Sequence, residues 1–299
     1  MDVDIRLLRY FVVVAEEASI TAAAERLFVS QPTLTRQIRQ LETTLGVDLF
    51  VRSHTGMSLT DPGRTLAGHL PALLDGWDTA VRETRQSAAV TAGVLRVGFV
   101  ATAANESTQR IVAAFTRRHP GWRVDMRRTD WADPTAGLAD GRVDAAFLRL
   151  PVPDHPRLRV EVLFTEPRWV ALPARHRLAG RESIDFPELW DDPFVAGPAE
   201  AGRARDHWLA TAERDDRAPI IGAVAHNSDE WLAAIANGYG VALAPEGVAR
   251  FYRRPGITFV PVTGVSGSRV AVGWAEERDG DPVLRDFVRC CIETRSGSR

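Results

Sequence analysis

Apolar residues recur at helical spacing between Ser30 and Gly46, and polar residues fill the positions between them. Ser30 can cap the amino end through its hydroxyl, and Pro32 gives up an N–H that has no partner in a first turn. Gly46 can take the left-handed conformation that ends a helix. At about 100° per residue the apolar positions form one narrow stripe that faces a core. These positions are Leu34, Ile38, Leu41 and Leu45.

The opposite face of this helix contains no carboxylate. A helix face that is merely solvated usually mixes Glu with Lys or Arg, whereas Arg, Gln and Thr hydrogen-bond base edges and phosphate oxygens. Taken alone, this composition suits a solvated face as well as a DNA-contacting face. The candidate DNA-contacting residues on this face and its flanks are Ser30, Gln31, Pro32, Thr33, Thr35, Arg36, Gln37 and Arg39.

The segments on either side of this helix favour DNA binding. Residues 19–29 predict a second short helix, and its three consecutive alanines allow the close crossing of a helix-turn-helix. Residues 47–60 alternate like a small hairpin with its tip at residues 54–56, which predicts a wing. Arg52 on this wing can reach a DNA backbone or minor groove, so it joins the candidate DNA-contacting residues.

Two further helices are predicted around this motif. Apolar spacing from Ile5 to Ala15 indicates a first helix that packs against the other two. From Thr60 to about Ala88 the pattern indicates one long helix, with a bend at Pro71 because proline removes a backbone hydrogen bond. A lone helix of this length has no core of its own, so its apolar seam is expected to face a partner. The seam consists of Leu66, Leu70, Leu73, Leu74, Trp77 and Val81.

Strand-like and helix-like segments alternate after residue 90. The first set predicts strands at 94–99, 122–127 and 143–147 and helices at 107–119 and 134–140. The second set, after a crossing near 168–173, predicts strands at 194–196, 220–224 and 241–244 and helices at 203–214 and 228–237. The third set predicts strands at 257–262 and 269–274 and a closing helix at 282–294, with which the chain returns to the first lobe. This alternation predicts parallel sheets flanked by helices. The sheets are expected in two lobes that the chain crosses between twice, as in periplasmic binding proteins.

Four motifs near the amino terminus resemble the DNA-binding domain of LysR-type transcriptional regulators. They are AAAERL at 22–27, VSQPTLTRQIRQLE at 29–42, LGVDLFVR at 45–52 and LTDPG at 59–63. The resemblance covers about residues 4–65 without a gap and is weaker in the rest of the chain. It implies an α/β protein with three parts: a winged helix-turn-helix at 1–60, a linker and dimerisation helix at 61–89, and a two-lobed, periplasmic-binding-protein-like (type II) effector domain at 90–299. The lobes are expected at about 90–167 with 265–299, and at about 168–264.

The same resemblance implies the partners. They are double-stranded operator DNA, a small-molecule effector in the cleft, and a twin chain that pairs through the linker helix. Further contacts between effector domains give an expected homotetramer, and RNA polymerase is a further candidate partner. The resemblance does not name the effector, the operator or the sign of regulation.

Effector-binding residues are expected at strand ends that line the cleft, because ligands of such sheets bind there. Trp131 and Arg149 together suggest a ligand with an aromatic or apolar body and an anionic group. An alternative interpretation without a ligand is that Arg149 forms an ion pair with a surface carboxylate such as Asp154. The full set is Thr102, Ala103, Trp131, Arg149, Ala196, Gly197, His226 and Asn227.

Composition adds less than pattern does. The formal net charge is −2, so DNA binding rests on a patterned surface and not on bulk basicity. Two adjacent cysteines, Cys290 and Cys291, fit a reducing compartment, and the apolar helical stripe around Cys291 favours a core position over redox sensing. The amino terminus lacks the basic start and apolar run of a signal peptide, and no stretch is long enough to span a bilayer, which predicts a cytoplasmic protein without membrane contact.

Other functional classes have less support. The seven histidines show no metal-ligand spacing, and no complete nucleophile, P-loop or dinucleotide motif occurs, so we expect no enzyme, metal or cofactor. A solute-binding protein would suit the two lobes but requires export. A DNA-architectural protein would leave the cleft without a role. The favoured interpretation is a ligand-responsive transcription factor.

Overall fold

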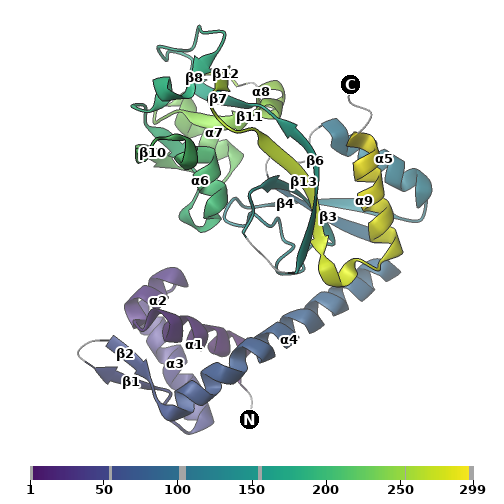
Figure 1. The fold of residues 1–299 in the computed structure, drawn as a ribbon. Helices are drawn as coiled ribbons and strands as arrows, with labels where there is room; N and C mark the ends of the chain where they lie inside the picture. Colours follow the sequence, from purple (N-terminus) through teal and green to yellow (C-terminus); the bar gives the residue numbers. More distant parts are fainter. Residues whose placement is uncertain (1–2, 54–55, 101–105, 154–156, 253, 296–299) are drawn as a thin grey trace. The chain divides into compact units, whose positions relative to one another are not determined.

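A computed structural model of the chain describes residues 3–53, 56–100, 106–153, 157–252 and 254–295 (Figure 1). It divides into two compact units, Met1–Thr84 and Arg85–Arg299. The helix α4 (Asp61–Thr91) spans the boundary between them and continues through Pro71. The first unit also contains α1 (Ile5–Glu17), α2 (Ile20–Arg26), α3 (Gln31–Leu45), β1 (Phe50–Ser53) and β2 (Gly56–Leu59).

Side-chain caps fix where the first three helices begin. Asp4, Ser19 and Ser30 each accept a hydrogen bond from a backbone N–H in the first turn that follows. Gly46 ends α3 with a φ of 71°, in the left-handed region. The predicted start and stop of this helix are therefore confirmed.

The core of the first unit lies between α1, α3, the wing and the start of α4. The stripe residues Leu34 and Leu41 are fully buried, and the rings of Phe11 and Phe50 meet at 5.1 Å between centroids. Leu70 of α4 belongs to the same core and is 1% exposed. The expectation that Leu70 faces a partner chain is therefore wrong, because this residue is already covered within its own unit.

The predicted wing is an antiparallel hairpin of β1 and β2. Its register places Arg52 opposite Met57 and Phe50 opposite Leu59. Residues 54 and 55 at the predicted tip lie outside the described residues, and so does the side chain of Arg52.

The first lobe of the second unit is built on a five-stranded sheet in the order β4-β3-β5-β13-β6. The strands β3, β4 and β5 are parallel, as predicted, whereas β13 runs antiparallel to both of its neighbours. Figure 1 shows α5 and α9 side by side against this sheet, where Phe115 and Phe287 pack edge to face. The elements are β3 (Val94–Val100), α5 (Glu106–Arg118), β4 (Arg123–Thr129), β5 (Ala145–Leu150), β6 (Leu158–Glu166), β13 (Ser268–Ala275), the 3-10 helix η4 (Glu276–Arg278) and α9 (Pro282–Arg295).

A predicted helix at 134–140 is wrong, since the segment is a series of turns. The Asp133 carboxylate accepts hydrogen bonds from the backbone N–H groups of Thr135 and Gly137, which competes with helical bonding. Ala136 and Gly137 then take left-handed φ values of 54° and 87°. Gly98 permits this path, because a Cβ there would lie 2.0 Å from the Ala136 carbonyl oxygen.

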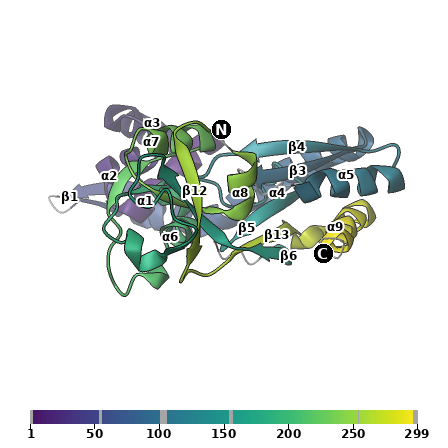
Figure 2. The same cartoon turned by 90° about the horizontal axis from the view of Figure 1, so that it is seen from above.

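The second lobe lies at the other end of this unit from α5 and α9 (Figure 2). Its main sheet has the order β11-β7-β12-β8, and the expectation of a parallel sheet is wrong there, because β7 runs antiparallel to both β11 and β12. The strands β9 and β10 pair in a smaller parallel sheet. The predicted crossing at 168–173 is itself strand β7, so the chain crosses earlier, at Pro167. The elements are β7 (Arg168–Pro173), β8 (Ile184–Asp185), η1 (Phe186–Leu189), β9 (Phe194–Ala196), η2 (Ala199–Ala201), α6 (Arg203–Leu209), η3 (Thr211–Glu213), β10 (Ile221–Val224), α7 (Ser228–Ala236), β11 (Ala242–Pro245), α8 (Glu246–Phe251) and β12 (Ile257–Thr263).

Candidate functional sites

The outward face of α3 carries two exposed arginines. Arg36 and Arg39 are exposed, and neither forms an ion pair or a side-chain hydrogen bond within the part of the chain that the structure describes. Four other arginines of the first unit are paired with carboxylates, in the pairs Arg6–Asp4, Arg9–Asp78, Arg26–Glu16, Arg26–Glu17 and Arg64–Asp61. The two α3 arginines therefore present uncompensated charge to solvent.

The remaining candidates on α3 fall into two groups. Gln31 and Pro32 are exposed, whereas Thr35 and Gln37 are half-buried. Ser30 and Thr33 share a hydrogen bond of 2.8 Å between their hydroxyls, so both take part in the amino-terminal cap. Ser30 itself is exposed and Thr33 is half-buried.

Glu42 is the only acidic residue of α3, and it is turned away from this face. Its Oε1 accepts hydrogen bonds from the backbone N–H groups of Leu49 and Phe50, at 2.9 and 3.2 Å. The carboxylate therefore holds the turn into the wing. Because it is used in this way, the outward face of α3 keeps its positive charge.

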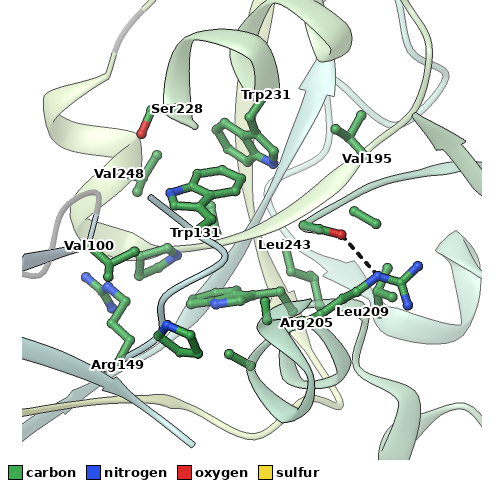
Figure 3. A pocket seen from close by; sticks show the side chains of 18 of the residues that line it. Val100, Trp131, Arg149, Val195, Arg205, Leu209, Ser228, Trp231, Leu243 and Val248 are labelled. Carbon is green, nitrogen blue, oxygen red and sulfur yellow. Dashed lines mark hydrogen bonds between the residues drawn. The ribbon is translucent and has the colours of Figure 1, made fainter. Parts of the chain in front are cut away.

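A cavity of about 120 Å³ lies between the two lobes of the second unit (Figure 3). The first lobe contributes Val100, Trp131, Pro134 and Arg149. The second lobe contributes Val195, Ala196, Gly197, Ala201, Ala204, Arg205, Trp208, Leu209, Ser228, Trp231, Leu243, Ala244, Pro245, Val248 and Tyr252. The walls are mainly apolar and aromatic, which is typical of a site for a small organic ligand.

Four of the predicted effector-binding residues line this cavity, namely Trp131, Arg149, Ala196 and Gly197. His226 and Asn227 do not: Asn227 caps α7 by accepting from the backbone N–H groups of Asp229 and Glu230, and His226 is exposed. Thr102 and Ala103 lie outside the described residues.

Trp131 joins the two lobes. Its ring meets that of Trp231 edge to face, with centroids 6.4 Å apart. Its backbone N–H also donates to the His226 carbonyl oxygen at 3.3 Å. A ligand in the cavity therefore lies beside a contact that an opening motion would break.

Arg149 is already engaged by the carboxylate of Glu166, whereas Asp154, the alternative partner, lies outside the described residues. Its Nη1 lies 2.9 Å from Glu166 Oε1 and donates to Ser268 Oγ at 2.9 Å. The side chains of Arg149 and Glu166 are only 8% and 9% exposed, and burial lowers the pKa of Arg149. The second oxygen of Glu166 accepts from the backbone N–H of Gly247 in the other lobe. This pair therefore has a structural role at the crossing between the lobes.

A second buried arginine, at the start of β7, contacts the segment between β12 and β13 where the chain returns to the first lobe. Arg168 is 1% exposed and donates to Glu213 Oε1 at 2.8 Å and to the backbone oxygens of His207 and Ser266. Burial and the nearby Arg168 charge lower the pKa of His207 to about 4. His207 is therefore neutral near pH 7, and the positive charge of this crossing is balanced by Glu213.

Most of the residues that line the cavity were not predicted from the sequence, among them Arg205, Trp208 and Trp231. Trp208 of α6 and Trp231 of α7 share apolar spacing with core residues, so periodicity alone does not separate cavity from core, and Arg205 of α6 looks like an ordinary charged helix position. Only the rule that ligands bind at strand ends pointed to this region.

Within the described parts of the chain, no three His, Cys, Asp or Glu side chains gather as a metal site would require. Both cysteines are buried in the core of the first lobe, and burial raises their pKa values. No helix among the described residues has the length and apolar character needed to cross a membrane.

A winged helix-turn-helix followed by a two-lobed domain with a ligand cavity defines the class of ligand-responsive transcription factors. Comparison with known proteins agrees. The model of the bacterial regulatory helix-turn-helix protein, lysR family, matches residues 5–64, and the LysR substrate binding domain model matches residues 88–296. The chain belongs to the LysR family and is a LysR-type transcriptional regulator, with a DNA-binding domain and an effector-binding domain.

Relatives match over nearly the whole chain. The chain is 32% identical to the transcriptional regulator TfdS of Cupriavidus pinatubonensis over 288 residues, which is 95% of this chain and 96% of TfdS. It is 30% identical to the Hca operon transcriptional activator HcaR of Escherichia coli over 294 residues, 95% of this chain and 96% of HcaR. The crystal structure of full-length CbnR with its target DNA has a TM-score of 0.55 at 26% identity, covering 98% of this chain and all of CbnR. Matches to both halves are not expected of a solute-binding or purely architectural protein.

Proposed function

We propose that α3 contacts operator DNA through Arg36 and Arg39, with Ser30, Gln31, Pro32, Thr33, Thr35 and Gln37 beside them and Arg52 at the wing. The observation that carries this proposal is that Arg36 and Arg39 are exposed and form no ion pair with a described residue, whereas four other arginines of the same unit are paired with carboxylates. Exposed guanidinium groups can bind guanine edges or phosphate oxygens directly, because no internal ion pair must first be broken.

Arg36→Ala should weaken operator binding by about 1–3 kcal/mol, because one guanine or phosphate contact is lost. The matched control is Arg6→Ala, which removes an exposed arginine that is paired with Asp4. A gel-shift titration of both variants on the native operator measures the difference. Unchanged affinity of Arg36→Ala would refute the assignment of α3, whereas equal loss in the control would point to a general charge effect.

We propose that the protein acts as a homodimer through α4 and as a homotetramer through further contacts of its effector domains. The support is that α4 leaves Leu73 and Trp77 50% and 49% exposed, one helical turn apart. Two DNA-binding domains are needed to read two half-sites about one turn of DNA apart. These two residues replace Leu70 as the centre of the pairing seam.

The dimer proposal predicts that Leu73→Asp with Trp77→Asp dissociates the protein, because two charges would enter the apolar seam. Sedimentation velocity at micromolar concentration measures the mass of the variant and the wild type. A wild-type monomer under these conditions, or a double variant that keeps the wild-type mass, would contradict pairing through α4.

In this proposal the cavity binds an effector and does not convert it, so the protein is a regulator without enzymatic activity. Ligand in the cavity favours one arrangement of the lobes, and this shift alters the spacing of the DNA-binding pairs. In the same proposal, the protein regulates transcription from operator DNA in the cytoplasm, and RNA polymerase is the partner whose activity changes.

A further inference from the structure

The cavity between the lobes contains two arginines whose surroundings differ. Arg149 is buried against Glu166 and Ser268. Arg205 of α6 is half-buried, and its Nε donates to the Gly197 carbonyl oxygen at 3.0 Å. No described carboxylate forms an ion pair with Arg205. Figure 3 shows the two guanidinium groups on opposite sides of the cavity.

An anionic ligand would meet different costs at these two residues. At Arg149 it would compete with Glu166, and displacing that carboxylate would leave a charge buried without its partner, which is strongly unfavourable. At Arg205 no such pair is broken. The bond from Nε to Gly197 fixes the guanidinium, and its remaining N–H groups suit the two oxygens of a carboxylate.

The rest of the cavity indicates the body of the ligand. Trp131, Trp208, Trp231 and Tyr252 supply aromatic walls, and Ser228 supplies a hydroxyl. No Asp or Glu lines the cavity among the described residues, so nothing there repels an anion. The cavity volume of about 120 Å³ is of the same order as the roughly 150 Å³ of a dry cavity that holds one benzene molecule, so it indicates a small ligand and not one with several rings.

We propose that Arg205, and not Arg149, holds the anionic group of the effector, and that the effector is a small carboxylate with one aromatic ring. The inference rests on the proposed effector-binding function and names the ligand class and the residue that recognises it. The ring lies among the tryptophans, and the carboxylate lies at Arg205. The Arg149–Glu166 pair remains intact when the ligand is bound.

The test uses matched acids and amides as probes: benzoate with benzamide, salicylate with salicylamide, and phenylacetate with phenylacetamide. Each is titrated into the full-length protein, and tryptophan fluorescence reports binding. At least one acid should bind the wild type more tightly than its amide. Arg205→Gln should weaken that acid by about 10- to 100-fold, because a charge-assisted hydrogen bond is lost, and should leave the amide unchanged.

Arg203→Gln is the matched control, because it removes the same charge from the same helix outside the cavity lining. It should keep the wild-type preference for the acid. The proposal is overturned if no acid binds more tightly than its amide, if Arg205→Gln keeps the preference, or if Arg203→Gln loses it equally. Unliganded melting temperatures of both variants should match the wild type, which separates ligand recognition from folding.

Failure of the Arg205 assignment can be distinguished from failure of the proposed function. DNA retention by the wild type without added ligand tests α3 alone. A protein that binds DNA and shows no acid preference loses only the assignment of Arg205, whereas a protein that retains no DNA fails at the level of its proposed function.

Discussion

Leu70→Asp should unfold the amino-terminal unit while the effector domain stays folded. Leu70 is 1% exposed in a core with Phe11, Leu41 and Phe50, so the variant would place a carboxylate among apolar side chains without a partner. Even Leu70→Ala should cost about 2–5 kcal/mol, through lost burial and the cavity it leaves. Hydrogen exchange followed by mass spectrometry would show the loss of protection in peptides from α1 and α3.

The control for this prediction is a substitution three residues further along α4. Leu73→Asp changes a half-exposed leucine, so protection of α1 and α3 should stay at the wild-type level. If Leu70→Asp preserved that protection and only reduced the mass of the assembly, Leu70 would belong to the pairing seam after all. Equal loss in both variants would mean that dissociation, and not core disruption, unfolds the unit.

Arg149→Met should destabilise the effector domain by about 3–5 kcal/mol, because it leaves the Glu166 carboxylate buried without its ion-pair partner. Urea unfolding followed by circular dichroism measures the loss. The double variant Arg149→Met with Glu166→Gln should recover much of it, because the orphaned charge is removed as well. The Gly247 N–H can still donate to the amide oxygen that replaces Glu166 Oε2.

Two results would contradict the structural role of Arg149. A single variant as stable as the wild type would mean that the pair contributes nothing to folding. A stable Arg149→Met variant that lost its preference for aromatic acids would restore Arg149 as the anion-binding residue and remove Arg205 from that role.

Helices with strong caps were the most predictable part of the molecule. The α3 helix was found within one residue at its start because Ser30, Pro32 and Gly46 leave few alternatives for its ends. The segment at 134–140 was misjudged because Asp133 binds backbone N–H groups that a helix would use. Apolar spacing carries no information about such local competition.

The functional sites were predictable in outline but not in their charge balance. Strand ends located Trp131 and Arg149, since the topology of the sheet places them at the cleft. Sequence alone did not show that Glu166 already engages Arg149, because the two residues meet only after β5 and β6 pair with β13 between them. For the same reason Leu70 looked like part of a free seam, although tertiary packing covers it.

Operator recognition by α3 is tested by sequencing the genomic DNA that the purified full-length protein retains, with Arg36→Ala and Arg6→Ala measured in parallel. The wild type should enrich a few sites that carry two related half-sites about one helical turn apart. Arg36→Ala should lose that enrichment, while Arg6→Ala should keep it. Enrichment no greater than that of a protein-free control, or identical enrichment by Arg36→Ala, would contradict operator recognition by α3.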